Sequence, residues 1–320
     1  MSYALTIQNG TNVYVPIVAD GVQWETTRKS TPSKLTFKVY RDDELDITEG
    51  NVVQFMVDGK QVFYGYVFTI DDNSDREMSI TAYDQLRYLK NKDSIIYSAK
   101  TCTQLLGILG KKYDLEIGKC EDTEYPTARN EDNATLFDII LNNLDETLMA
   151  TGTLYVVWDD FGKLRITSIE SLVIDDLLLD EETGKSYNYS TSIDKDTYNQ
   201  VKLTYDNKKT GVREVYMAKD SSTQDDWGVL QYYEKVNSLT GVKEKATKLL
   251  NYYNTKSRSM ELKDYVGDIR CRAGRSPIVK MKLRDKTLCN YMLIEKATHT
   301  FKDNEHTMNL SLSGNYIFEA

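Results

Sequence analysis

A weak internal repeat of β-type sequence constrains the fold of this chain more than any other feature. One copy covers residues 49–81 and the other covers residues 266–312. Each copy opens with a glycine, continues through a strand of alternating polarity and a long strand, and closes after a polar hairpin tip. Unrelated β-domains share such patterns, so chance similarity is the alternative. A true duplication predicts that Gly50 and Gly267 occupy equivalent backbone positions.

Length and hydrophobic periodicity predict a mainly β fold with α-helices, of the α+β class. A chain of 320 residues exceeds the size of one comfortable core, so we expect two or more domains. Short alternating strands favour a small β-barrel or sandwich. We predict a first β-domain over 1–92, an α/β accessory domain over 93–175, and a second β-domain over 176–320 with a helical insertion near 240–256.

Three segments show the period of a helix rather than that of a strand. Thr101 and Gln104 resemble a capping box that precedes a short apolar run. Residues 136–148 place their apolar side chains on one face, and Gly152 is a suitable C-terminal cap. A third helix is predicted over 242–253.

The charge balance argues against a nucleic-acid binder. The formal net charge is -9, and the longest basic groups are pairs such as Lys111-Lys112. Nucleic-acid binding by counterion release needs clustered lysine and arginine, so we expect no specific nucleic-acid binding. The N-terminus shows no secretory signal, and no stretch approaches the ~18 apolar residues that a membrane span needs. We therefore expect synthesis in the cytoplasm and no membrane insertion.

Searches for catalytic, cofactor and metal motifs give no convincing match. The tripeptide Asp160-Phe161-Gly162 spells a kinase metal motif, but it lies in a predicted hairpin turn without an H-R-D loop. The four cysteines, at positions 102, 120, 271 and 289, fit neither zinc nor redox spacing. We interpret the cysteines as small buried hydrophobic residues, and we predict no cofactor and no metal.

The two histidines leave one catalytic alternative open. His299 and His306 are seven residues apart, which places them on opposite faces of a continuous strand. A hairpin between them would bring the two rings together. Cys271 and Cys289 lie in the same region, so a nucleophilic hydrolase is not excluded by residue counts, although a triad is defined by geometry.

Tyrosine is unusually frequent, with 23 residues in 320. Tyrosine suits half-buried strands, and that preference alone accounts for much of the excess. Tyrosine also favours protein interfaces, because it buries a large ring and keeps a polar tip. Sugar-binding grooves are a third interpretation.

Several segments resemble the XkdQ/YqbQ type of phage tail and baseplate hub protein, which is similar to the late control D hubs of contractile tails. The resemblance keeps its order over nearly the whole chain, and its most specific piece is Asp84-Gln85-Leu86-Arg87-Tyr88-Leu89. The segments that carry it are residues 62–67, 81–93, 132–140, 193–203, 227–231 and 299–308.

The resemblance implies a structural protein without catalysis. A hub of this type forms a homotrimer in which each subunit contributes two tube-like β-domains, so the ring is pseudo-hexameric and acts as a symmetry adaptor. One face of the ring meets the hexameric tail tube and the other meets the trimeric central spike. Baseplate wedge and tape-measure proteins are further expected partners. Members occur in phages, in defective prophages and in phage-tail-like bacteriocins.

The resemblance also marks structural positions, and it competes with two other functions. The family-motif positions are Gly65, Asp84, Leu86, Arg87, Tyr88, Leu89, Asn199, Val201, Gln231 and His299. One alternative is a peptidoglycan or glycan hydrolase of the same particle, and the other is a glycan-binding adhesin. The absence of an acid/base or metal signature in the sequence argues against the hydrolase.

Overall fold

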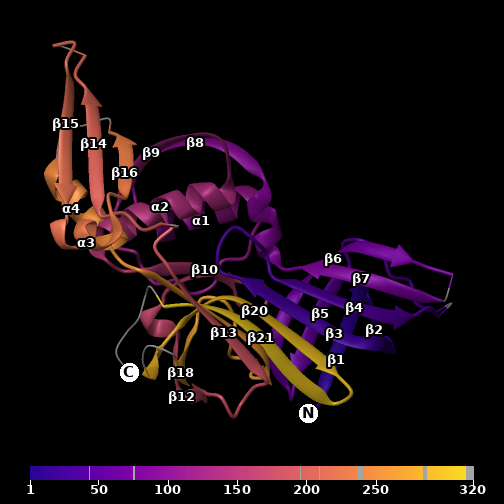
Figure 1. The fold of residues 1–320 in the computed structure, drawn as a ribbon. Helices are drawn as coiled ribbons and strands as arrows, with labels where there is room; N and C mark the ends of the chain where they lie inside the picture. Colours follow the sequence, from indigo (N-terminus) through magenta and orange to yellow (C-terminus); the bar gives the residue numbers. More distant parts are fainter. Residues whose placement is uncertain are drawn as a thin grey trace. The chain divides into compact units, whose positions relative to one another are not determined.

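The computed structural model describes residues 1–42, 44–74, 76–194, 196–208, 210–236, 241–283 and 287–314. Strands predominate over helices, which confirms the predicted mainly β fold with α (Figure 1). The chain divides into two compact units. Unit 1 contains Met1–Asn188 and Met260–Leu312, and unit 2 contains Tyr189–Ser259 with a short stretch that begins at Ser313. The division into three domains at residues 92 and 175 stays a prediction.

Eleven of the described strands form one sheet. Side chains alternate in polarity along these strands, so that in β4, for example, every second residue is buried. The strands are β1 (Tyr3–Asn9), β2 (Asn12–Tyr14), β3 (Val18–Thr27), β4 (Lys34–Tyr40), β5 (Val52–Val57), β6 (Lys60–Asp72), β7 (Glu77–Tyr83), β13 (Ser186–Ser192), β17 (Ser257–Val266), β20 (Leu293–Lys302) and β21 (Glu305–Ser313). Their order is β13-β17-β21-β20-β3-β4-β7-β6-β5-β1-β2.

This sheet is rolled around its core. The rings of Phe55 in β5 and Phe301 in β20 have centroids 5.0 Å apart, although β20 and β5 are far from neighbouring in the strand order. A flat sheet would hold these strands about 24 Å apart, because adjacent strands lie about 4.8 Å apart. The roll stops before the outer strands β2 and β13 pair, so the described strands form no closed barrel. The expectation of a barrel is corrected to an open, rolled sheet.

The helices and strands that follow β7 in the sequence form a second hydrophobic core. Its elements are η1 (Gln85–Lys90), β8 (Lys92–Lys100), α1 (Cys102–Tyr113), β9 (Thr127–Thr135), α2 (Leu136–Thr151), β10 (Tyr155–Asp159) and β11 (Leu164–Ser168). Buried leucine and isoleucine side chains of α1 and α2 pack together with η1 and β11. Thr101 and Gln104 form the predicted capping box of α1, and Gly152 caps α2 as predicted.

The rest of unit 1 is a small sheet beside these elements. The short helix η2 (Glu170–Leu172) leads into β12 (Val173–Leu179), which pairs in parallel with β18 (Ser276–Lys282). β18 then pairs with β19 (Thr287–Tyr291) in the antiparallel direction. The register of β12 shifts between Ile174 and Leu178, so the residues between them bulge from the ladder.

Unit 2 is a three-stranded sheet with helices. Its elements are β14 (Gln200–Asp206), β15 (Arg213–Lys219), α3 (Ser221–Trp227), β16 (Gln231–Lys235) and α4 (Val242–Tyr253). The strand order is β15-β14-β16. The helix α4 has the predicted bounds and covers one face, where the Tyr253 ring stacks on Tyr232 at 5.1 Å and Lys245 pairs with Glu234. The short helix α3 was not predicted, because its polar residues show no helical periodicity.

Two further expectations need correction. Gly50 lies in the left-handed region with φ +87°, whereas Gly267 does not, and a Cβ on Gly267 would overlap the His306 ring. The two glycines are therefore not in equivalent backbone positions.

Of the four free cysteines, Cys102 and Cys271 are buried as expected, but Cys120 is half-buried and Cys289 is exposed on the short strand β19. None of the described helices is long and apolar enough to cross a bilayer.

Candidate functional site: a buried junction in unit 1

The motif Asp84 to Leu89 forms the bend between the two cores of unit 1. Asp84 is the N-cap of η1, and its Oδ1 accepts hydrogen bonds from the backbone N–H groups of Leu86 (3.1 Å) and Ser33 (3.2 Å). Leu86 and Leu89 are buried in the core under α1 and α2. The motif therefore fixes the direction of the chain as it leaves the rolled sheet.

The charges of Asp159 and Arg272, which are distant in the sequence, act on the buried Asp84. The carboxyl of Asp159, at the end of β10, accepts from the backbone N–H of Gly162 at 2.7 Å. Arg272 donates from Nη1 to the Asp159 carbonyl at 2.7 Å, and its guanidinium lies 4.4 Å from the centre of the Trp158 ring. Gln85 donates to the Gly162 carbonyl. Three separate segments of the chain are thus joined at one buried point.

Burial dominates the electrostatics of this junction. Removal from water raises the pKa of Asp84 well above its usual value, and the nearby charge of Asp159 raises it further. Burial also raises the pKa of Asp159 to about 6 and lowers that of Arg272 to about 10. One guanidinium beside two carboxyl groups is electrically neutral when one carboxyl keeps its proton. Burial raises the pKa of both carboxyl groups, which favours the state in which the pair keeps one proton.

An aromatic row on β6 packs over the motif. Tyr66 and Phe68 both contact the Tyr88 ring, with centroids 6.0 and 6.1 Å apart. Arg87 lies 5.2 Å from the centre of the Phe68 ring, in a cation–π contact. Gly65 lies on the same strand, and a Cβ there would come within 2.3 Å of the Tyr83 carbonyl oxygen. The two strands approach so closely that only glycine fits.

His299 forms a second buried polar group, in the predicted hairpin. Its Nε2–H donates to the Cys271 carbonyl at 2.9 Å, so its Nδ1 must accept a hydrogen bond from His306 Nε2–H, also at 2.9 Å. Burial lowers the pKa of His299 to about 3 and that of His306 to about 4. Both rings are therefore neutral at pH 7, and His299 is fully buried against Trp24.

The motif positions of unit 2 lie around the start of β14. Asn199 is fully buried; its Nδ2 donates to the Gly228 carbonyl at 2.7 Å and its Oδ1 accepts from the Leu230 N–H at 2.9 Å. Val201 is buried on β14, and Gln231 accepts from Gln200 at 2.8 Å. These side chains hold β14 and β16 in register through their own hydrogen bonds.

The predicted motif positions thus fall into three groups, and the structure does not unite them in one site. Gly65 and the Asp84 to Leu89 motif lie together, His299 lies in a second group, and the unit 2 residues form a third. Sequence reasoning missed Asp159 and Arg272, because nothing local marks two residues that meet only in the fold. Asp84 and His299 are 1% and 0% exposed, so no substrate reaches either group. Within the described residues, no cluster of acids, histidines and cysteines suits a metal ion.

Sequence comparison places the chain in a family. Residues 22–313 match the family described as YQBQ-like, and the chain belongs to that family. An uncharacterized protein of Bacillus subtilis, YqbQ, is 32% identical over 235 residues, which cover 70% of each chain. The phage-like element PBSX protein XkdQ of the same organism is 28% identical over 319 residues and 93% of each chain. The family resemblance inferred from the motifs is confirmed.

Solved structures show the same fold at low sequence identity. The 43 kDa tail protein of prophage MuSo2 from Shewanella oneidensis has a TM-score of 0.71 and 14% identity, with 97% of this chain and 98% of that chain covered. The E. coli c3393 protein, a type VI secretion component described as similar to tail proteins gp27 and gp5 of bacteriophage T4, has a TM-score of 0.58 and 11% identity. It is matched over 99% of this chain and 79% of its own.

Proposed function

We propose that this chain is a structural phage-tail protein, the baseplate hub of a contractile tail or of a phage-tail-like bacteriocin. The observation that carries the proposal is the whole-chain match to a prophage tail protein together with membership of the YQBQ-like family. The fold is shared from end to end rather than over one domain, so the likeness covers the architecture as a whole.

A hub role also agrees with the edges of the rolled sheet. The rolled sheet ends in β2 and β13, and each has a hydrogen-bonded neighbour on one side alone among the described strands. Exposed edges promote pairing with other chains, and a ring removes them by pairing or covering. In the proposed hub, three copies form a pseudo-hexameric ring that joins the hexameric tail tube to the trimeric central spike. Wedge and tape-measure proteins surround it.

The chemistry of the buried groups supports a role without catalysis. A general acid or base must reach substrate, and a nucleophile needs a base at hydrogen-bond distance. Asp84, Asp159 and His299 are buried, and each is hydrogen-bonded to a backbone group. The Cys271 thiol is buried, which raises its pKa to about 12, and only its carbonyl contacts His299. This arrangement offers no activated nucleophile.

Light scattering after size exclusion tests the proposed assembly. Three chains of 36.8 kDa give a trimer of about 110 kDa. A trimer, alone or after addition of purified tail tube or spike protein, is the expected result. A chain that stays monomeric with both partners present would refute the hub. Clearing of a cell-wall suspension by the pure protein would instead favour a hydrolase, and binding to a glycan array would favour an adhesin.

A further inference from the structure

One face of the unit 2 sheet lies opposite α4 and is open in the described residues. The register places Met217, Lys202 and Tyr233 side by side across β15, β14 and β16. In the next row toward the hairpin tip lie Val215 and Lys235, on either side of Thr204. Because side chains alternate along a strand, these residues point away from the face that α4 covers. We call this surface the open face.

The open face carries exposed apolar side chains on its two outer strands. Val215 and Met217 on β15 and Tyr233 on β16 are 48%, 55% and 52% exposed, and Lys202 and Thr204 of β14 lie between them. Single exposed apolar residues are common on proteins, but three on one face of a small sheet mark that face as a candidate interface. The Tyr233 hydroxyl lies 2.9 Å from Thr204 Oγ1, which holds its ring over the sheet. A fixed aromatic ring loses little entropy on binding.

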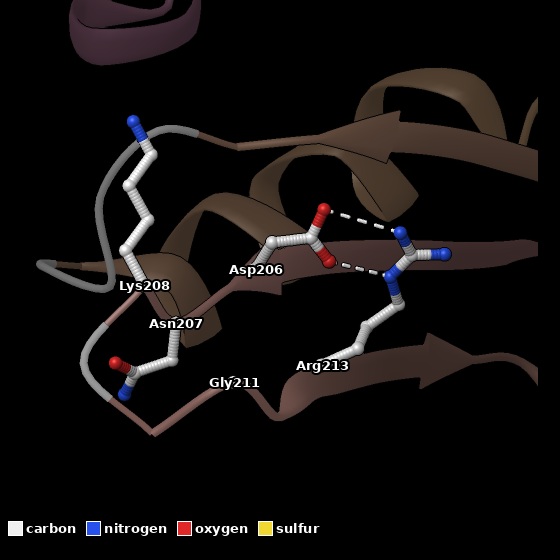
Figure 2. A pocket seen from close by; sticks show the side chains of 5 residues that line it. All are labelled: Asp206, Asn207, Lys208, Gly211 and Arg213. Carbon is white, nitrogen blue, oxygen red and sulfur yellow. Dashed lines mark hydrogen bonds and ion pairs between the residues drawn. The ribbon is translucent and has the colours of Figure 1, made fainter.

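Four basic side chains lie among and beside these apolar residues. Arg213 and Lys235 share the carboxylate of Asp206 at 2.6 Å each, at the hairpin end of the sheet. Figure 2 shows the Asp206–Arg213 pair beside Gly211, in a shallow pocket at the hairpin tip. Lys202 and Lys219 have no carboxylate in ion-pair contact among the described residues. The open face therefore has four cations to one acid, on a chain whose net charge is -9.

A basic face with exposed apolar side chains fits an acidic surface that carries an exposed apolar side chain. Nucleic acid is the weaker candidate, because the chain as a whole is acidic. The chain itself offers the required surface in residues 175–182. Asp175, Asp176, Leu178, Glu181 and Glu182 are all exposed there, and the bulge in β12 takes Asp175 and Asp176 out of the ladder. Asp176 pairs with Arg270 of the same chain, which leaves Asp175 and Glu182 as the acids of the proposed contact.

We propose that the open face of one subunit docks on residues 175–182 of a second copy of this chain. Leu178 contacts Met217, Val215 and Tyr233, while Asp175 and Glu182 pair with Lys202 and Lys219. This contact joins two different surfaces, so three copies can close a ring head to tail. The inference rests on the proposed trimeric hub and names one contact within it.

The size of the open face sets how strong this contact is. Two strands of seven residues and one of five cover roughly 310 Å², whereas a standard interface buries about 800 Å² on each partner. The open face is therefore one part of a larger interface. Its loss weakens the trimer and does not by itself abolish every contact between copies.

The test is a charge reversal with rescue. In Lys202→Glu/Lys219→Glu, we expect the trimer to dissociate at concentrations at least roughly ten-fold above those of the wild type, measured by light scattering over a dilution series. Adding Asp175→Lys and Glu182→Lys to the same chain restores the opposite charges, and we expect wild-type behaviour within about three-fold. Lys243→Glu/Lys256→Glu is the matched control, since both lysines are exposed in unit 2 away from the open face.

The outcomes separate this contact from the hub itself. If the wild type trimerises and the Lys202→Glu/Lys219→Glu trimer is equally stable, the proposed contact is wrong and the hub proposal stands. Weakening without rescue by the reversed acids would also overturn the proposed contact, because the partner surface would be another. A wild-type chain that never trimerises, even with tail tube and spike protein present, refutes both the hub and the proposed contact. If the variant instead loses binding to a single-stranded DNA probe at unchanged mass, the open face binds nucleic acid and the proposal is wrong.

Discussion

The neutral His299–His306 pair predicts how unit 1 responds to acid. In the folded chain the pKa of His299 is about 3 and that of His306 about 4, and both are about 6.5 when the chain unfolds. Between these values the unfolded chain binds protons that the folded chain does not. Stability is therefore fully present above pH 6.5 and falls as the pH falls toward 4.

The magnitude follows from the width of that window. Each pH unit between the two pKa values corresponds to about 1.4 kcal/mol for one group. From pH 6.5 to 5, His299 accounts for a loss of about 2 kcal/mol. His306 is partly exposed, so we reduce its share to about 1 kcal/mol. Asp159 acts in the opposite direction, because its raised pKa of about 6 lets the folded chain gain a proton first.

A His306→Gln variant separates these contributions. Glutamine keeps an N–H donor for His299 Nδ1 but does not titrate. We expect its free energy of unfolding to fall about 1 kcal/mol less than that of the wild type between pH 7.5 and 5. Urea unfolding followed by tryptophan fluorescence measures this, since Trp24 stacks on His299. Asp159 affects both proteins equally and cancels. Parallel pH profiles would refute a neutral His306 in the folded chain.

Three further predictions test the packing. Gly65→Ala should lower the free energy of unfolding by about 3 kcal/mol, because the new Cβ would overlap the Tyr83 carbonyl. Gly107→Ala on α1, where nothing lies within 4 Å, should raise it by up to ~1 kcal/mol. Calorimetry that finds the same sign for both variants would contradict this reasoning. Asp84→Asn should cost under ~1 kcal/mol in urea unfolding if Asp84 is protonated, and a loss above ~3 kcal/mol would show that it is charged. Asn199→Ala leaves the Gly228 and Leu230 backbone groups unpaired, which should speed amide exchange in unit 2 by an order of magnitude or more.

Local sequence patterns were enough to predict many of the helices and strands. The helices α1 and α2 were predictable because their caps and apolar runs lie within one stretch of sequence, and α4 was predictable from its periodicity. The long ribbon of β8 and β9 was missed, because its strands are polar and are separated by the whole of α1. Alternating polarity marked strands β4 and β7, but it held no information on how far the sheet rolls.

The candidate site was less predictable than the fold. Asp84 drew attention through the motif around it, but its partners Asp159 and Arg272 come from two other parts of the chain. No spacing rule links three residues that meet only after folding. The histidine pair was foreseeable as one of two options, since a hairpin between His299 and His306 brings the rings together and a continuous strand would not.

The position of unit 2 in the chain has an evolutionary consequence. The chain enters unit 2 through β13 and returns through β17, and these two strands are hydrogen-bonded neighbours. Neighbouring strands are about 5 Å apart, so a tight turn could replace everything between them. An insertion with adjacent ends can lengthen, shrink or be exchanged without redesign of the sheet that hosts it. Changes of length or sequence in this module would therefore leave the rolled sheet unchanged.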